Sequence, residues 1–251
     1  MKMSSDPFED DRSESLTVYK LDKYKRSLSP GATATKPKYV LEVNGKLAYF
    51  KFELTEKEIC AELLSSKVGK CLGIPIAETF AAEYKGTKGI VSFDIGEYTE
   101  VDDSESYSVK DYTNIPGFID MCLFDYLVMN EDRHARNWGI SNNAVAPLFD
   151  HNVTFGADLV IKDLDYFMER VASAFSLHTD YDNSWNVILK YMCQNYADHV
   201  KSFIQKLDSI NDIQNHTSDL TAVDQLVLRE KIQMLGERRQ YMVRKVDEYL
   251  V

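Results

Sequence analysis

The chain has 251 residues, a length that suits one large domain or two closely joined lobes. Its apolar share of 44% and charged share of 27% are those of an ordinary globular protein, which excludes a mainly disordered, collagenous or fibrous chain. Because 29 Lys and Arg residues stand against 40 Asp and Glu residues, the formal net charge is -11. Direct binding to nucleic acid or to an anionic membrane is therefore not expected.

The cysteines and the N-terminus indicate a cytoplasmic protein. Four cysteines lie far apart and form no C-x-x-C pair, namely Cys60, Cys71, Cys122 and Cys193. We expect them to be buried thiols in a reducing compartment. Residues 1–15 are polar and acidic, which predicts a disordered tail and not a secretory signal. No apolar run reaches the roughly 18 residues that a membrane-spanning helix needs.

Strand patterns dominate the first part of the chain after a polar loop at 27–37, where Pro and Gly interrupt small residues. Alternating apolar residues predict strands at 39–43 and 47–52. The intervening Asn44 and Gly45 are typical of a two-residue hairpin turn, because both tolerate a positive φ.

A helix and two further strands follow. Thr55 with Glu58 three residues later is a capping-box pattern that starts a helix, and Gly73 is a typical end for it. Residues 78–83 and 89–95 then predict two more strands.

The second part of the chain is mainly helical. Residues 118–129 are apolar on nearly every side, which predicts a buried helix, and 144–149 suits a short strand. Further helices are expected at 161–175, 184–210 and 220–250. The predicted fold is α+β, with a β-rich N-lobe at 16–97, an acidic connection at 98–116 and an α-helical C-lobe at 117–251.

Three polar residues in the second part have the pattern of a phosphoryl-transfer site. Asp132 is followed by Asn137 five residues later, and Asp150 follows a short apolar run. Phosphoryl transfer from ATP uses an Asp near the attacking hydroxyl, and an Asn and an Asp as oxygen ligands of Mg²⁺. The D-x-x-x-x-N spacing is that of the protein-kinase catalytic loop. Taken alone this is a weak signal, because Asp and Asn also cap turns.

The first part of the chain supplies the context that a kinase needs. Lys51 ends an apolar strand, and Glu58 and Glu62 lie on the next helix. A kinase uses such a lysine on the nucleotide phosphates and such a glutamate to orient it. The bland alternatives are that Lys51 protects a sheet edge and that Glu62 is a solvated helix acid.

On these motifs the sequence resembles the HipA-like kinases, whose toxin members phosphorylate proteins. Residues 131–137, EDRHARN, are similar to that family's catalytic loop, including the His two positions after the Asp. Residues 147–150, PLFD, look like the strand that ends in its metal-binding Asp. The resemblance runs from about residue 27 into the C-terminal helices, and it implies a two-lobed, protein-kinase-like fold.

The resemblance also implies a role for each matching residue. It makes Asp132 the catalytic base, Asn137 and Asp150 the Mg²⁺ ligands, Lys51 and His134 contacts of the ATP phosphates, Glu62 the acid that orients Lys51, Phe93 part of the hinge at the adenine, and Gly31 part of the phosphate-covering loop. Glu62 is preferred over Glu58, because the capping box already uses Glu58.

Three features depart from the family. The loop has a single glycine, and its hydroxyl residues Ser27, Ser29, Thr33 and Thr35 are all candidates for autophosphorylation. His and Asn follow Asp150, where eukaryotic kinases have Phe and Gly. The chain is also short for a HipA toxin and is expected to lack the family's N-terminal subdomain, so an antitoxin partner is left open.

The sequence therefore predicts an ATP- and Mg²⁺-dependent kinase that phosphorylates Ser or Thr of a protein substrate, and possible self-phosphorylation is included in that hypothesis. Two alternatives keep the same fold. One is a pseudokinase that binds nucleotide and serves as an interaction module, and the other is a kinase of small molecules or lipids.

Overall fold

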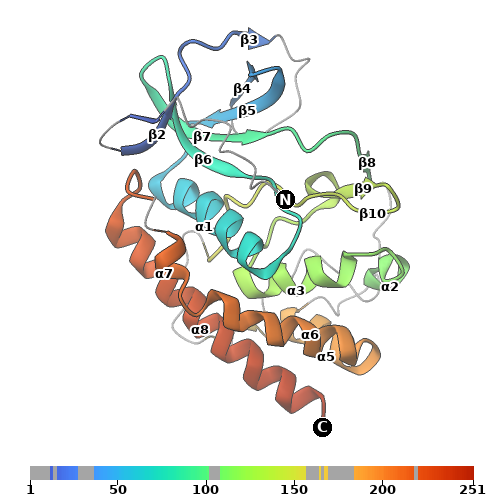
Figure 1. Ribbon diagram of the computed structural model, residues 1–251. Helices are drawn as coiled ribbons and strands as arrows, with labels where there is room; N and C mark the ends of the chain where they lie inside the picture. Colours follow the sequence, from blue (N-terminus) through green and yellow to red (C-terminus); the bar gives the residue numbers. More distant parts are fainter. Residues whose placement is uncertain are drawn as a thin grey trace, which may run out of the picture.

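The computed structural model describes residues 12–13, 16–27, 37–101, 108–156, 164, 167–168, 184–217 and 220–251. Most of the expected acidic tail, the Gly31 loop with Ser29, Thr33 and Thr35, and most of the helix expected at 161–175 lie outside these residues. The described parts form two lobes, with the larger sheet above and most helices below in Figure 1.

The upper lobe is a mixed sheet with the strand order β1-β2-β6-β7-β5-β4-β3. Its strands are β1 (Arg12–Ser13), β2 (Leu16–Lys20), β3 (Arg26–Ser27), β4 (Lys38–Val43), β5 (Lys46–Phe52), β6 (Thr79–Tyr84) and β7 (Thr87–Phe93). All neighbours in this sheet are antiparallel except β2 and β6, which are parallel. The sequence patterns did not predict β2, and Ser27 lies in β3 instead of the expected loop.

The predicted hairpin between β4 and β5 is confirmed. Val43 pairs with Lys46, so the turn contains only Asn44 and Gly45, with φ values of 50° and 77°. Two consecutive residues with positive φ define the turn that matches the twist of a β-hairpin. This turn fixes the register along β5 and hence the position of Lys51 near the end of that strand.

Helix α1 (Glu56–Leu72) crosses beneath the sheet, and its predicted caps are confirmed. Thr55 and Glu58 form both hydrogen bonds of the capping box, and Gly73 ends the helix with a left-handed φ of 69°. One face of α1 packs under the sheet, where Cys60 and Leu63 meet Ala81 of β6 and Ile90 of β7.

The lower lobe is helical around one short sheet. Its elements are β8 (Thr99–Glu100), α2 (Val109–Tyr112), α3 (Phe118–Val128), η2 (Ala135–Asn137), β9 (Gly139–Ser141), β10 (Ala144–Val145), α5 (Trp185–Asn195), α6 (Ala197–Lys206), η3 (Leu207–Ile210), α7 (Ile213–His216) and α8 (Gln225–Tyr249). The strands β8, β9 and β10 pair in that order. The segment 98–116, which was expected to be a plain connection, thus contributes a strand and a helix to this lobe.

Two expected elements differ in extent. The strand expected at 144–149 is only the two residues of β10, because Pro147 has no N–H to continue the ladder. The single helix expected at 184–210 is wrong, since it breaks at Tyr196 into α5, α6 and η3. The side chain of Asn195 donates to the carbonyl of Tyr191, and this local hydrogen bond competes with the helical backbone.

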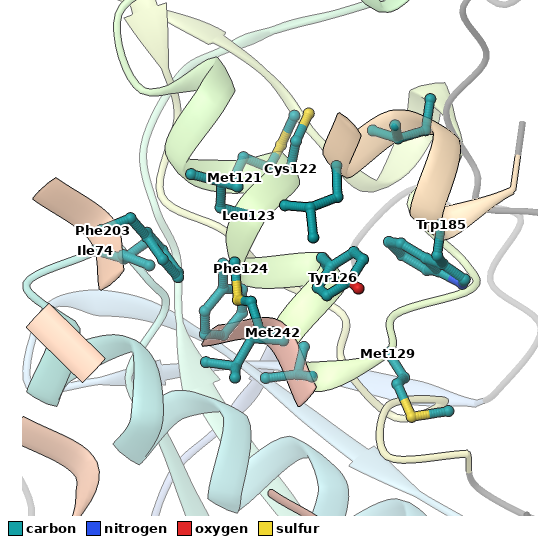
Figure 2. Packing of buried hydrophobic residues seen from close by; sticks show 14 of the residues in the cluster. Ile74, Met121, Cys122, Leu123, Phe124, Tyr126, Met129, Trp185, Phe203 and Met242 are labelled. Atoms are coloured by element: carbon teal, nitrogen blue, oxygen red, sulfur yellow. The ribbon is translucent and has the colours of Figure 1, made fainter. Parts of the chain in front are cut away.

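Helix α3 is the centre of the lower core, and all but one of its residues are buried, as its sequence predicted. Figure 2 shows its side chains among those of the surrounding helices, with Tyr126 beside Trp185 of α5. Helix α8 joins both lobes, because Leu228 packs with Cys60 and Leu63 of α1 while Met242 belongs to the core around α3. The active cleft is thus bounded by elements that share one packed framework.

Candidate functional site

The side chain of Lys51 lies at the junction of the two lobes. Its Nζ is 2.7 Å from Oε1 of Glu62 on α1 and 3.0 Å from Oδ1 of Asp150 in the lower lobe. Burial alone would lower the pKa of Lys51, but the carboxylates of Glu62 and Asp150 outweigh burial and raise it. Lys51 is therefore a fixed positive charge at neutral pH, held between two elements that are far apart in the sequence.

A glycine on the neighbouring strand permits this position. Gly89 of β7 pairs with Phe52, and a Cβ at Gly89 would lie 2.1 Å from the carbonyl oxygen of Lys51. Only a residue without a side chain lets β7 approach β5 so closely. The sequence analysis included Gly89 only as the start of a strand.

Glu62 connects the lysine to the segment that carries Asp150. Its Oε1 binds Lys51, and its Oε2 accepts a hydrogen bond of 3.1 Å from the backbone N–H of His151. Glu58 instead binds the backbone N–H of Thr55 in the capping box, 2.7 Å away. Of the two glutamates that the sequence left in competition, Glu62 is the one in contact with Lys51.

Asp150 has an unusual backbone conformation for a residue with a side chain. Its φ is 61°, in the left-handed region that Asp enters more readily than most residues. Its carboxylate is about one-third exposed, at 35%, and one oxygen faces Lys51. Residues held in such conformations are concentrated at functional sites, where surrounding contacts maintain them.

The catalytic-loop residues lie together on the opposite side of the cleft. Nδ2 of Asn137 donates to the carbonyl oxygen of Asp132 at 2.7 Å and to its Oδ2 at 3.2 Å. This orientation leaves the amide oxygen of Asn137 available as an acceptor. The Asp132 side chain is 47% exposed, so it is accessible to an incoming hydroxyl. Nε2 of His134 lies 3.8 Å from Oδ1 of Asp132.

A buried arginine, which the sequence analysis did not single out, holds the loops in place. Arg133 is fully buried and forms two hydrogen bonds of 2.9 Å to the carboxylate of Asp125 on α3. Its Nη1 donates to the carbonyl oxygens of Asn137 at 2.7 Å and Phe149 at 2.9 Å. One guanidinium therefore contacts the backbone of one candidate metal ligand and of the residue before the other.

His151 completes this network. Its Nε2 lies 2.9 Å from Nη2 of Arg133, and it is fully enclosed. Burial, together with the charges of Arg133 and Lys51, lowers the pKa of His151 well below its ordinary value. The imidazole is therefore neutral, and its Nε2 accepts the hydrogen bond from Arg133. A signal for Arg133 was present in the sequence, since a charged residue beside a catalytic motif needs a partner when it is buried.

Two expected nucleotide contacts stand apart from this group. Phe93 ends β7 opposite Ala48, and its ring packs with the cluster on the far face of the sheet from Lys51. Only the backbone at Phe93 is left to meet an adenine, as the hinge interpretation requires. The other expected contact, Gly31, lies outside the described residues.

The oxygen atoms around the cleft suit Mg²⁺. Asp150 and Asn137 offer a carboxylate and an amide oxygen, which are hard ligands of the kind this ion prefers, and nucleotide phosphates complete such a shell in kinases. Within the described part of the chain, no group of three or more His, Cys, Asp or Glu side chains forms a metal cage. In the same part, no helix has both the length and the apolar character needed to span a bilayer.

Comparison with known proteins places the fold. No protein-family model matches the sequence, and no curated protein matches it either. The structure is similar to that of the Helicobacter pylori proinflammatory kinase CtkA, with a TM-score of 0.73 and 19% identity over 92% of this chain and 99% of that chain.

A second solved structure is the HipA toxin of Shewanella oneidensis MR-1, determined in complex with HipB and its operator DNA. It aligns with a TM-score of 0.59 and 14% identity, over 92% of this chain and 68% of that chain. The chain therefore has a two-lobed, protein-kinase-like fold. The relationship to HipA-like kinases that the motifs indicated is supported by this shared fold.

Proposed function

We propose that the chain is a HipA-like kinase that transfers the γ-phosphoryl group of ATP to a Ser or Thr hydroxyl of a protein. The observation that carries this proposal is the position of Lys51 between Glu62 and Asp150, which are 11 and 99 residues away in the sequence. Kinases require both the lysine–glutamate ion pair and the metal-binding aspartate to be in place.

The residues of the cleft divide the work of phosphoryl transfer. Lys51 holds the nucleotide phosphates, and Glu62 keeps its ammonium group in position. Asp132 accepts the proton of the attacking hydroxyl, with Asn137 fixing the orientation of its carboxylate through the contact at 3.2 Å. Asn137 and Asp150 would hold Mg²⁺, which when bound neutralises charge on the phosphates. Catalysis then depends on positioning and electrostatics.

The nature of the acceptor is the finer part of the proposal. A protein Ser or Thr is favoured by the resemblance of residues 131–137 and 147–150 to HipA-like kinases, whose toxin members phosphorylate proteins. An antitoxin is suggested in the same way, because the HipA of Shewanella oneidensis was solved with HipB. The reaction itself needs no such partner.

The decisive experiment compares wild type with Asp132→Asn and with Asp198→Asn, a control on the exposed face of α6. Each protein is incubated with Mg²⁺ and labelled ATP, alone and with cell lysate. Loss of a general base reduces transfer roughly 10²- to 10⁴-fold, so Asp132→Asn should lose protein labelling while retaining nucleotide binding. Asp198→Asn should label like wild type.

Two outcomes would contradict the proposal. Nucleotide binding without labelling of any protein would favour the pseudokinase, and label found only on small molecules or lipids would move the acceptor to that class. Equal labelling by wild type and Asp132→Asn would remove Asp132 from the role of base.

A further inference from the structure

A second lysine lies beside Lys51 on the cleft side of the sheet. Lys38 is the first residue of β4, and it is the direct partner of Lys51 in the antiparallel pairing of β4 with β5. Residues directly opposite in such a pair place their side chains on the same face, with Cβ atoms about 4.5–5.5 Å apart. The opposite face of these strands carries Tyr39, Leu41 and Phe50, which pack in the upper core.

The surroundings of Lys38 connect it with the cleft. It is half-buried, and its Nζ lies 5.4 Å from the ring centroid of Tyr49, which is on the same face of β5. Burial and then the charge of Lys51 lower the pKa of Lys38, while the charge of Asp150 opposes that change. The ammonium of Lys38 is thus close enough to feel both Lys51 and the candidate metal ligand.

The two lysines differ in how their charges are balanced. Lys51 is paired with the carboxylates of Glu62 and Asp150. Among the residues that the structure describes, no carboxylate lies within ion-pair distance of Lys38. Like charges directly opposite each other destabilise a sheet, and such conflicts between local preference and fold are typical of functional sites. An anion in the cleft would resolve this one.

We propose that Lys38 is a second phosphate-binding cation of the cleft, and that it contacts the polyphosphate of the nucleotide next to Lys51. This inference rests on the proposed function and extends it, because it assigns a residue to the recognition of a nucleoside di- or triphosphate as opposed to a nucleoside. Lys51 already shares its charge with two carboxylates, whereas Lys38 brings an uncommitted charge to the phosphates.

The test measures binding directly and does not depend on turnover. Isothermal titration with Mg²⁺ present compares adenosine, ADP and a non-hydrolysable ATP analogue on wild type and Lys38→Met. Loss of one hydrogen bond to a charged group weakens binding roughly 10- to 100-fold. Lys38→Met should show that loss for ADP and the ATP analogue and an unchanged affinity for adenosine.

Two further measurements separate this role from a structural one. Without nucleotide, Lys38→Met should melt at the same temperature as wild type or higher, because it removes a like-charge pair; a structural lysine would lower the melting temperature. Lys25→Met removes an exposed lysine from the same lobe and should leave all affinities unchanged.

The outcomes are distinguishable. Equal affinity of wild type and Lys38→Met for the ATP analogue would overturn the inference and leave the proposed function intact. A similar loss for adenosine would overturn it as well, since the effect would not depend on the phosphates. Failure of wild type to bind any nucleotide would overturn the proposed function, and the role of Lys38 with it.

Discussion

Arg133 shows how one side chain organises the site. Its guanidinium uses its planar fork to bind Asp125 through two hydrogen bonds, and it donates further to two loop carbonyls. Every one of these partners is in the lower lobe, and through His151 the network reaches the loop contacted by Glu62. A lysine has a single ammonium group and cannot reproduce this geometry.

Substitution of Arg133 should therefore be severe. In Arg133→Met the carboxylate of Asp125 is left buried without its cation, and breaking such a pair lowers the free energy of unfolding by about 3–5 kcal/mol. Urea denaturation of wild type and variant measures this change. Arg133→Lys keeps the charge and should lose less stability than Arg133→Met.

The control for this prediction is Arg229→Met, on the exposed side of α8, which should change the free energy of unfolding by no more than about 0.5 kcal/mol. If Arg133→Met remained within about 1 kcal/mol of wild type, the buried network would not have the importance that its geometry indicates.

At the scale of elements, α8 determines how the helix that carries Glu62 is held. The first turns of α8 place Leu228 against Cys60 and Leu63 of α1, and later turns pack against α3 and α5. The buried Arg238 also donates to the carbonyl oxygen of Tyr126 near the end of α3. A helix at the C-terminal end of the chain thus supports both sides of the cleft.

This arrangement predicts different effects for two leucines of the same helix. Leu228 is 4% exposed and Leu226 is 61% exposed. Leu228→Ala should reduce the free energy of unfolding by about 2–5 kcal/mol, because it leaves a cavity next to α1. Leu226→Ala should change it by no more than about 0.5 kcal/mol. Chemical denaturation tests the pair.

Loss of packing at Leu228 should also affect transfer, because α1 then holds Glu62 less firmly. Kinase activity of Leu228→Ala should fall below that of Leu226→Ala under conditions where both proteins are folded. Similar stability for the two variants would mean that α8 does not support α1 in solution.

At the scale of the whole molecule, the charge balance bears on nucleotide binding. A protein with a net charge of -11 is not an obvious receptor for a polyanion such as ATP. The cleft resolves this conflict locally, with Lys51 and Lys38 on one strand pair and oxygen ligands suited to Mg²⁺ at Asn137 and Asp150. Long-range repulsion is screened beyond about 8 Å at physiological salt.

Removal of the metal should therefore weaken stabilisation by nucleotide. At 100 times its Kd, Mg·ATP adds about 2.7 kcal/mol to the free energy of unfolding. The same ATP concentration with a chelator should add clearly less and give a smaller rise in melting temperature. Thermal denaturation of wild type in the two conditions measures the difference. Equal shifts with and without Mg²⁺ would show that the metal takes no part in binding.

The sequence by itself determined the features that depend on neighbouring residues. Asn44 and Gly45 specify a tight turn, and Thr55 with Glu58 specifies a helix start, because turn geometry and capping involve only a few consecutive residues. The spacing of Asp132 and Asn137 likewise places both in one loop, where they are in contact. These local signals were sufficient for the fold class.

Only the tertiary structure decided what depends on residues distant in the chain. It brought Lys51 to Glu62 and Asp150, enclosed Arg133 with Asp125, and turned the ring of Phe93 away from the cleft. It also placed Lys38 beside Lys51 through strand register. The physical reason is that burial and charge pairing arise from the packing of elements against one another, which no local pattern of residues records.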